Sequence, residues 1–225
     1  MPAIMIFQLL SGDMGPTQFV ALLIALVFGI SFHEFAHAAA ATWLGDSTPG
    51  RQGRLTLQPA AHLEVMGSLM FLIAGFGWGK PVQYNPYALR GNPRTGQAII
   101  AAAGPFTNFI LAVVVAILTR VAIFVLDTRA WFLLPSSPER TLIELLAWIV
   151  YFNLVLSFFN LIPIFPLDGF TILSGILPAQ LAEFFDATRQ YGFFILMLLF
   201  FAGSSLLGPL LYQPLSTLWR LLIGL

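Results

Sequence analysis

Three ionisable side chains in the stretch ISFHEFAHAAAATWL form the pattern His-Glu-x-x-His: His33, Glu34 and His37. At about 100° per residue, positions four apart lie one turn apart on the same helical face, so two imidazoles there can bind one metal ion. Glu34 lies beside the first histidine, where its carboxylate can accept a proton from a water molecule that the metal activates. Such a water can attack a carbonyl carbon, so the pattern is typical of zinc-dependent hydrolysis.

The surroundings of this pattern are those of a membrane helix. The chain of 225 residues is 58% hydrophobic and 9% charged, whereas soluble domains carry about 25% charged residues. An ionisable side chain inside a spanning helix costs about 2.5–3.5 kcal/mol on insertion scales and usually marks a functional site. The alternative is a buried, hydrogen-bonded cluster that stabilises helix packing, and we favour the metal site over it.

A catalytic zinc ion usually has three protein ligands and one open position. Asp168 is a candidate third ligand, because Pro163 and Pro166 precede it and exclude a plain helix there. Irregular backbone at membrane depth occurs only where it is buried in protein or lines a wet cavity. Asp168 can equally well cap the short helix that follows it. His62, the remaining histidine, is expected to be structural or to line the entrance rather than to bind the metal.

Two asparagines in apolar segments, Asn108 and Asn160, are candidates for substrate binding. A side-chain amide can hold an extended peptide or the oxyanion of a tetrahedral intermediate. Polar side chains in membrane helices also commonly join neighbouring helices by hydrogen bonds. For Asn108 both interpretations stand, whereas for Asn160, eight residues before Asp168, we favour the substrate role.

Long apolar runs predict the elements that must position these side chains. Residues 17–44, 97–125 and 142–164 are each long enough for a helix that spans the membrane. Residues 65–78 are apolar but short, which favours a re-entrant segment, and GRLTL before it and KPVQY after it predict a short β-hairpin. Residues 190–225 are apolar and interrupted by Gly and Pro, so they predict shorter helical segments.

The basic residues predict the orientation of the chain. Arg51, Arg54, Lys80, Arg90 and Arg94 all lie between the first and second predicted spans, and basic loops favour the cytoplasmic side. A re-entrant segment keeps all five on that side, which places the metal site nearer the cytoplasm. With no long linker and no internal repeat, we expect one integral membrane domain over residues 1–225 with a core at about 17–177.

Composition excludes several other kinds of site. The chain has no cysteine, which rules out disulfides, thiol catalysis and cysteine-ligated metals. Ten acidic and ten basic residues balance, so no polyanionic partner such as a nucleic acid is expected. The expected surroundings are instead the lipid bilayer.

Three motifs in the order FHEFAHAAAATWLGD, AAAGPFTNFILA and NLIPIFPLDG resemble the site-2 protease family of intramembrane zinc metalloproteases. The resemblance runs over about residues 32–169. It implies that His33, His37 and Asp168 bind one zinc ion per chain and that Glu34 is the general base. It also implies a three-helix catalytic core. Together with the elements predicted above, we expect an all-α, polytopic membrane protein in which helices flank this core and the hairpin or re-entrant element lies between its first two helices.

The same resemblance implies a hydrolase, an endopeptidase that cuts membrane proteins in or near a transmembrane helix during regulated intramembrane proteolysis. The implied partners are such a membrane-protein substrate and an upstream protease of the site-1 type that makes the first cut. We expect a small member of the family, without PDZ or CBS domains, in the plasma membrane of a prokaryote.

Two other functional classes remain to be weighed against a protease. A membrane metal-ion transporter would need several ligand sets along a path and usually has internal repeats, whereas this chain has one compact set. A catalytically inactive homologue that only binds membrane substrates would be expected to lack Glu34 or a metal ligand, and all of them are present.

Overall fold

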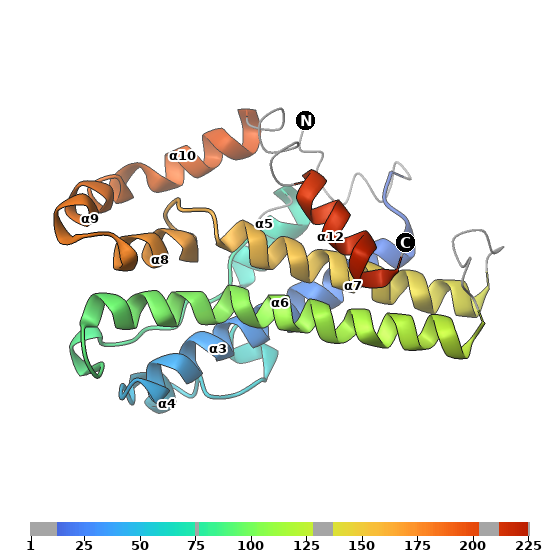
Figure 1. Cartoon of the computed structure of the whole chain (residues 1–225), viewed down its shortest axis with the longest axis horizontal. Helices are drawn as coiled ribbons and strands as arrows, with labels where there is room; N and C mark the ends of the chain where they lie inside the picture. The colour runs from blue at the N-terminus through green and yellow to red at the C-terminus, as the bar shows by residue number, and fades with distance from the viewer. Residues whose placement is uncertain (1–12, 75–76, 128–136, 203–211, 225) are drawn as a thin grey trace.

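The computed structural model describes residues 13–74, 77–127, 137–202 and 212–224 (Figure 1). This part of the chain is mostly helical, as predicted. In chain order the elements are α2 (Pro16–Ile24), the π-helical turn η1 (Ala25–Gly29), α3 (Ile30–Trp43), α4 (Thr48–Arg51), the 3-10 turn η2 (Pro59–Ala61), α5 (Val65–Ala74), the 3-10 turn η3 (Pro86–Ala88), α6 (Pro93–Val125), α7 (Pro138–Asn160), α8 (Asp168–Ile176), α9 (Ala179–Asp186), α10 (Arg189–Ala202) and α12 (Gln213–Ile223).

Three helical stretches in the described residues are long and apolar enough to cross a membrane, which confirms the predicted spans. They are Pro16–Trp43, Pro93–Val125 and Pro138–Asn160. Each begins at a proline, whose fixed φ suits the first helical turn. The side chains of Asn92 and Ser137 cap the second and third stretches by accepting hydrogen bonds from the backbone N–H groups that follow.

The first span contacts the other two with different halves. Its first half, α2, packs against α7, and its second half, α3, packs against α6, which in turn lies along α7 (Figure 1). The π-helical turn η1 joins the two halves. The half that carries the histidines therefore faces α6.

Small side chains let α6 and α7 approach closely. Ala112 and Ala116 of α6 pack against Ala147 and Val150 of α7 in a cluster of fully buried residues. Alanine at such an interface allows helix backbones to come close, which is how membrane helices gain contact energy. Helix α12 covers one side of this pair, and the indole N–H of Trp219 donates to the Ala147 carbonyl at 2.6 Å.

The predicted β-hairpin is wrong, because the described residues contain no strand between the first two spans. The backbone of Pro81 has no N–H, so it cannot donate to a strand ladder. The N–H of Val82 donates instead to the Glu34 carboxylate at 3.2 Å. A side chain joins the two predicted strands: the guanidinium of Arg54 donates to the carbonyl groups of Ala61 and Pro81.

The two ends of the segment that contains α5 lie side by side. Its helix, α5, has ten residues and is therefore about 15 Å long, half the roughly 30 Å thickness of the hydrocarbon layer. Leu63 and Gly79, on either side of it, form an isolated antiparallel bridge, and the Lys80 N–H donates to the His62 carbonyl at 2.6 Å. This geometry suits the re-entrant arrangement, in which both ends stay on the same side.

The helical path breaks where the prolines predict. Helix α7 ends at Asn160 and α8 begins at Asp168, so Pro163 and Pro166 lie in irregular backbone. Gly169 packs so closely against the Leu161 carbonyl that a Cβ atom there would collide with it. The break therefore turns the chain and sets the start of α8 against α6, with which α8 packs.

Aromatic and cation–π contacts hold α9 and the start of α10 against α8 and the segment before it. The ring of Phe170 stacks on that of Phe185 with centroids 4.6 Å apart, and the guanidinium of Arg189 lies 5.2 Å from the ring centroid of Phe165 and 5.3 Å from that of Phe170. These contacts place α9 and the start of α10 beside α8. Of the helical segments predicted for 190–225, α10 and α12 are described, and residues 203–211 and 225 lie outside the described residues.

Candidate metal centre

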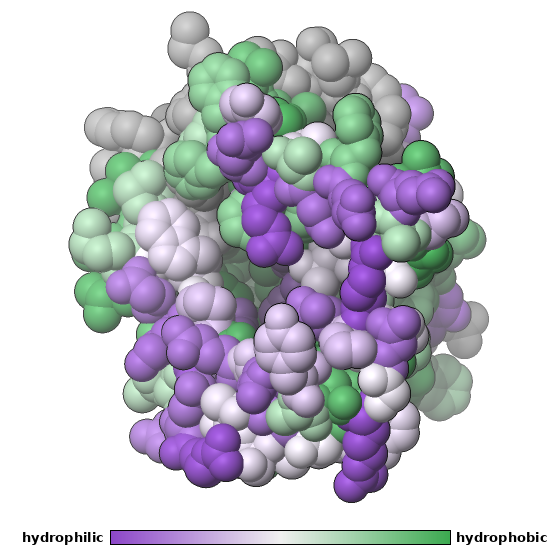
Figure 2. Space-filling model, turned by 90° about the vertical axis from the view of Figure 1, so that its left-hand side faces the viewer, coloured by the Kyte–Doolittle hydropathy of each residue, from purple (hydrophilic) through white to green (hydrophobic). Residues whose placement is uncertain are grey.

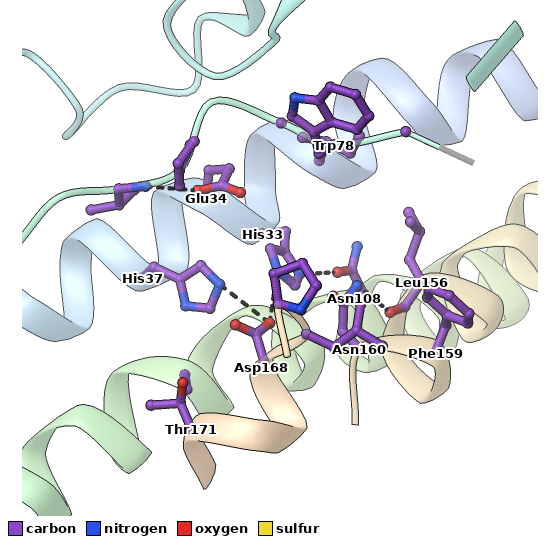
Figure 3. Close-up of a pocket in the computed structure, with 18 of the residues that line it drawn as sticks. His33, Glu34, His37, Trp78, Asn108, Leu156, Phe159, Asn160, Asp168 and Thr171 are labelled. Atoms are coloured by element: carbon purple, nitrogen blue, oxygen red, sulfur yellow. Dashed lines mark hydrogen bonds and ion pairs between the residues drawn. The ribbon is translucent and has the colours of Figure 1, made fainter. Parts of the chain in front are cut away.

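Both histidines of the His-Glu-x-x-His pattern point from α3 toward the start of α8 (Figure 3). They are buried, each 8% exposed, and their ring centroids lie 4.6 Å apart with the ring planes at 89°. The spacing of four residues on a helix thus brings the imidazoles of His33 and His37 to one point.

Asp168, the first residue of α8, meets the two imidazoles there. Its Oδ2 atom lies 3.0 Å from Nε2 of His33 and 3.4 Å from Nε2 of His37. The ligand atoms of the three side chains all lie within 4.8 Å of one another. The residue at the N-cap position is Leu167, which makes no side-chain cap. The Asp168 carboxylate therefore faces the histidines from the N-terminal end of α8.

Hydrogen bonds on the far side of each ring fix which nitrogen faces Asp168. Nδ1 of His37 lies 2.7 Å from the Ile100 carbonyl oxygen. A carbonyl only accepts, so the proton of a neutral His37 is on Nδ1 and Nε2 keeps its lone pair. Nδ1 of His33 lies 2.7 Å from Oδ1 of Asn108 and is held in the same way. Such outer partners orient metal-binding histidines in proteins.

The three side chains fit a zinc ion. Two imidazole nitrogens and a carboxylate oxygen converge, and the only polar side-chain atoms described around the buried Asp168 Oδ2 are these two nitrogens. A buried carboxylate needs a positive charge beside it, and a metal cation at this point supplies one. Two nitrogen ligands and one carboxylate oxygen, with one position left open, are a donor set of catalytic zinc sites.

The close approach of α6 to this centre depends on Gly104. A Cβ atom on Gly104 would lie 2.5 Å from Nε2 of His37 and 2.6 Å from Cε1 of His33. Any side chain there would occupy the space at the ligand nitrogen of His37 and against the ring of His33. The absence of a side chain on Gly104 therefore makes room for the two histidine rings.

We expect Gly104→Ala to lower the peptidase activity that the resemblance implies by about 100-fold or more, because displacing catalytic groups by about 1 Å can cost that much. Zinc content should fall with it, since one imidazole must move away. Gly96→Ala is the matched control on α6, because its Cβ would meet only the Leu89 side chain, whose tip can rotate. Activity assays with metal analysis decide, and wild-type zinc and activity in Gly104→Ala would contradict the geometry.

Glu34 lies on α3 beside the metal group and lines the same cavity as His33, His37 and Asp168 (Figure 3). Its Oε2 atom accepts a hydrogen bond from the N–H of Val82 at 3.2 Å. The segment that follows α5 thus holds the carboxylate at the cavity wall. Nothing in the sequence pattern pointed to Val82 as its partner.

The cavity has a volume of about 620 Å³. Much of its wall is apolar, with Leu156 and Phe159 from α7, Phe71 from α5 and Met197 from α10. Tyr84 lines it as well, and burial together with the charge of Asp168 raises the pKa of its phenol, so this residue stays neutral. The end of the molecule that carries α4 and the start of α6 is largely hydrophilic around a central hollow (Figure 2).

A buried carboxylate fixes the loop that carries Tyr84 and Val82. Asp46 accepts hydrogen bonds from the Thr48 N–H and hydroxyl, at 2.9 and 2.6 Å, and from the Asn85 N–H at 2.7 Å. Burial by itself would raise the pKa of Asp46, but these hydrogen bonds outweigh it and lower the pKa of the carboxyl below its ordinary value. The end of α3 is thereby tied to the loop that contacts Glu34.

The other polar residues singled out from the sequence lie in different places. Asn160 lines the cavity, and its amide N–H donates to the Leu156 carbonyl at 2.9 Å. Asn108 is fully buried and contacts both the cavity and His33. His62 is also fully buried, but its Nε2 lies 2.7 Å from the Thr56 carbonyl oxygen, away from the metal group.

Comparisons with known proteins identify the family of this chain. The model of peptidase family M50 matches residues 130–201, which include Asp168. "Putative zinc metalloprotease YwhC" of Bacillus subtilis is 35% identical over 193 residues, 84% of this chain and 85% of the relative. "Putative zinc metalloprotease Rip2" of Mycobacterium tuberculosis is 27% identical over 192 residues, 83% of this chain and 68% of that relative. No solved structure matches the chain. The chain belongs to peptidase family M50, the site-2 protease family.

Proposed function

We propose that this chain is a zinc-dependent endopeptidase of the membrane, which hydrolyses peptide bonds in or near the transmembrane segments of other membrane proteins. The observation that carries the proposal is the convergence of His33, His37 and Asp168 inside a cavity that Glu34 also lines. Membership of family M50 and the names of the relatives support the zinc metalloprotease class.

In the proposed reaction Glu34 accepts the proton of the attacking water and donates it to the leaving amine. His33, His37 and Asp168 would hold the zinc ion, which, when bound, would lower the pKa of water to about 7 and polarise a carbonyl. Asn160 has two amide N–H groups, one of which donates to Leu156. We assign the other to the developing oxyanion.

The substrate must present an extended backbone to this cavity. A helix hides its carbonyl groups in internal hydrogen bonds, so a transmembrane substrate has to unwind locally before attack. The apolar wall formed by Leu156, Phe159 and Phe71 suits the apolar side chains of such a segment. The cavity thereby combines an apolar binding surface with a polar reaction centre, as ligand sites commonly do.

We further propose that the metal centre lies nearer the cytoplasmic face of a prokaryotic plasma membrane. The end of the molecule seen in Figure 2 is rich in hydrophilic residues. The segment between the first two spans carries Arg51, Lys80 and Arg90, and Arg94 lies at the start of α6. Basic loops favour the cytoplasm. The partners in this proposal are a membrane-protein substrate and an upstream protease of the site-1 type that trims it first.

Purified protein tests the proposal directly. We expect one zinc ion per chain by metal analysis, cleavage of a peptide that forms a transmembrane helix, loss of cleavage in a zinc chelator, and recovery when zinc is returned. The competing transporter would instead move zinc into sealed vesicles without cutting the peptide. A chain that binds zinc but cuts no membrane peptide would favour an inactive homologue and contradict the proposal.

A further inference from the structure

A second buried asparagine lies behind the metal centre, where the three long helices meet. Asn153 of α7 is 3% exposed, and its Oδ1 atom accepts a hydrogen bond from the amide of Asn108 on α6 at 3.2 Å. Its own amide donates to the Ile149 carbonyl at 3.0 Å, which fixes which end of the side chain faces Asn108. The metal ligands do not contact Asn153 directly in the described hydrogen bonds.

The contacts of Asn108 determine its orientation. An asparagine amide has two N–H groups. In Asn108 one donates to the Gly29 carbonyl at 3.0 Å and the other to Asn153 at 3.2 Å. Its Oδ1 is therefore the atom left to face His33, and it lies 2.7 Å from Nδ1 of that ring. An oxygen at this position places the His33 proton on Nδ1 and leaves Nε2 free to bind metal.

Gly29 permits this arrangement. A Cβ atom there would lie 2.8 Å from the Leu156 side chain, 3.2 Å from Oδ1 of Asn153 and 3.4 Å from the Asn108 amide nitrogen. The residue is the last of the π-helical turn η1. The first span thus presents a bare backbone carbonyl to the asparagine pair, just before the turn that carries His33.

We propose that Asn153 is a positioning residue that sets the tautomer of His33 through Asn108, and thereby the zinc affinity of the centre. This inference rests on the proposed function, because it assumes that His33 is a zinc ligand. Without the acceptor on Asn153, one of the two hydrogen bonds that orient the Asn108 amide is lost and only the bond to the Gly29 carbonyl remains, so the amide turns over more readily. Its NH₂ group would then face Nδ1 of His33 and shift the proton to Nε2, the atom that faces Asp168. A protonated Nε2 cannot bind the metal.

Zinc affinity, measured by competition with a chelator, is the first test. Loss of a partner that orients a metal-binding histidine typically weakens metal binding 10–100-fold, and we expect Asn153→Leu to lie near the lower limit, about tenfold. Asn153→Asp keeps an acceptor oxygen for Asn108 and should bind zinc more tightly than Asn153→Leu. The matched control is Thr119→Val on α6, which removes a fully buried hydroxyl that bonds only within its own helix in the described contacts.

A double-mutant cycle separates this role from general helix packing. If Asn153 acts through Asn108, Asn153→Leu should weaken zinc binding in the wild-type background but have little further effect in Asn108→Leu. Additive losses in the double variant, or wild-type affinity in Asn153→Leu, would overturn the proposal.

Nitrogen NMR on the metal-free protein tests the tautomer itself. The chain has three histidines, so ¹⁵N-histidine labelling gives a simple spectrum. For neutral rings we expect His33 and His37 to carry the proton on Nδ1, and we expect only His33 to change in Asn153→Leu. An unchanged His33 signal would refute the relay. Because no zinc is present, this result stands apart from the proposed function, which would fail instead if the wild-type chain bound no zinc.

Discussion

Glu34→Gln should lower the rate of peptide cleavage by about 10²–10⁴-fold, the usual contribution of a general acid–base group. Glutamine has nearly the same shape as glutamate. Its amide oxygen can still accept the hydrogen bond that the Val82 N–H donates to Glu34 at 3.2 Å. It cannot take the proton from water, so chemistry should be lost while the cavity and the metal group persist. Single-turnover cleavage of a transmembrane peptide, with zinc analysis of the same sample, measures both.

The control for this variant is Glu64→Gln. Glu64 accepts a hydrogen bond from the Gly67 N–H at 2.5 Å at the start of α5 and does not line the cavity. The Glu64→Gln protein should cleave the peptide at nearly the wild-type rate and should have the same zinc content per chain. If Glu34→Gln still cleaved at the wild-type rate, Glu34 would not be the base.

Asp168→Asn should weaken zinc binding by more than about 100-fold. Removing an outer hydrogen-bond partner of a metal ligand already costs 10–100-fold, and this change removes the charge of a ligand. The carboxylate lies 3.0 and 3.4 Å from the two imidazole nitrogens, so two histidines alone would remain. Competition with a chelator gives the affinity, and cleavage should be lost at zinc concentrations that saturate the wild type.

This variant also separates the two interpretations of Asp168 that the sequence left open. Asparagine is as good a helix cap as aspartate, so a purely capping residue would tolerate the change and zinc affinity would stay at the wild-type value. Asp186→Asn is the matched control, since Asp186 is an acid of α9 that accepts a hydrogen bond from Ser174 of α8 at 2.7 Å. It should leave zinc affinity unchanged.

Features of the fold and the site that have a local cause could be predicted from the residues alone. The spacing of His33 and His37 makes them meet whenever the segment is helical, because one turn of helix separates them. The apolar runs predict the three long helices, since roughly 20 apolar residues in a row have few other stable structures. Pro163 and Pro166 likewise predict the break before Asp168, because proline cannot continue a helix.

Which distant groups meet depends on how the helices pack, and local sequence does not contain that information. Asp168 is 131 residues from His37, and its place beside the imidazoles follows from how α8 packs on α6. The β-hairpin failed because Val82 and Pro81 bond to side chains from elsewhere in the chain, a choice that strand propensity does not contain. The contacts of Gly104 with the histidines, and of Asn108 with His33, have the same origin. They depend on which faces α3, α6 and α7 turn toward one another, and that is set by the packing of the whole bundle.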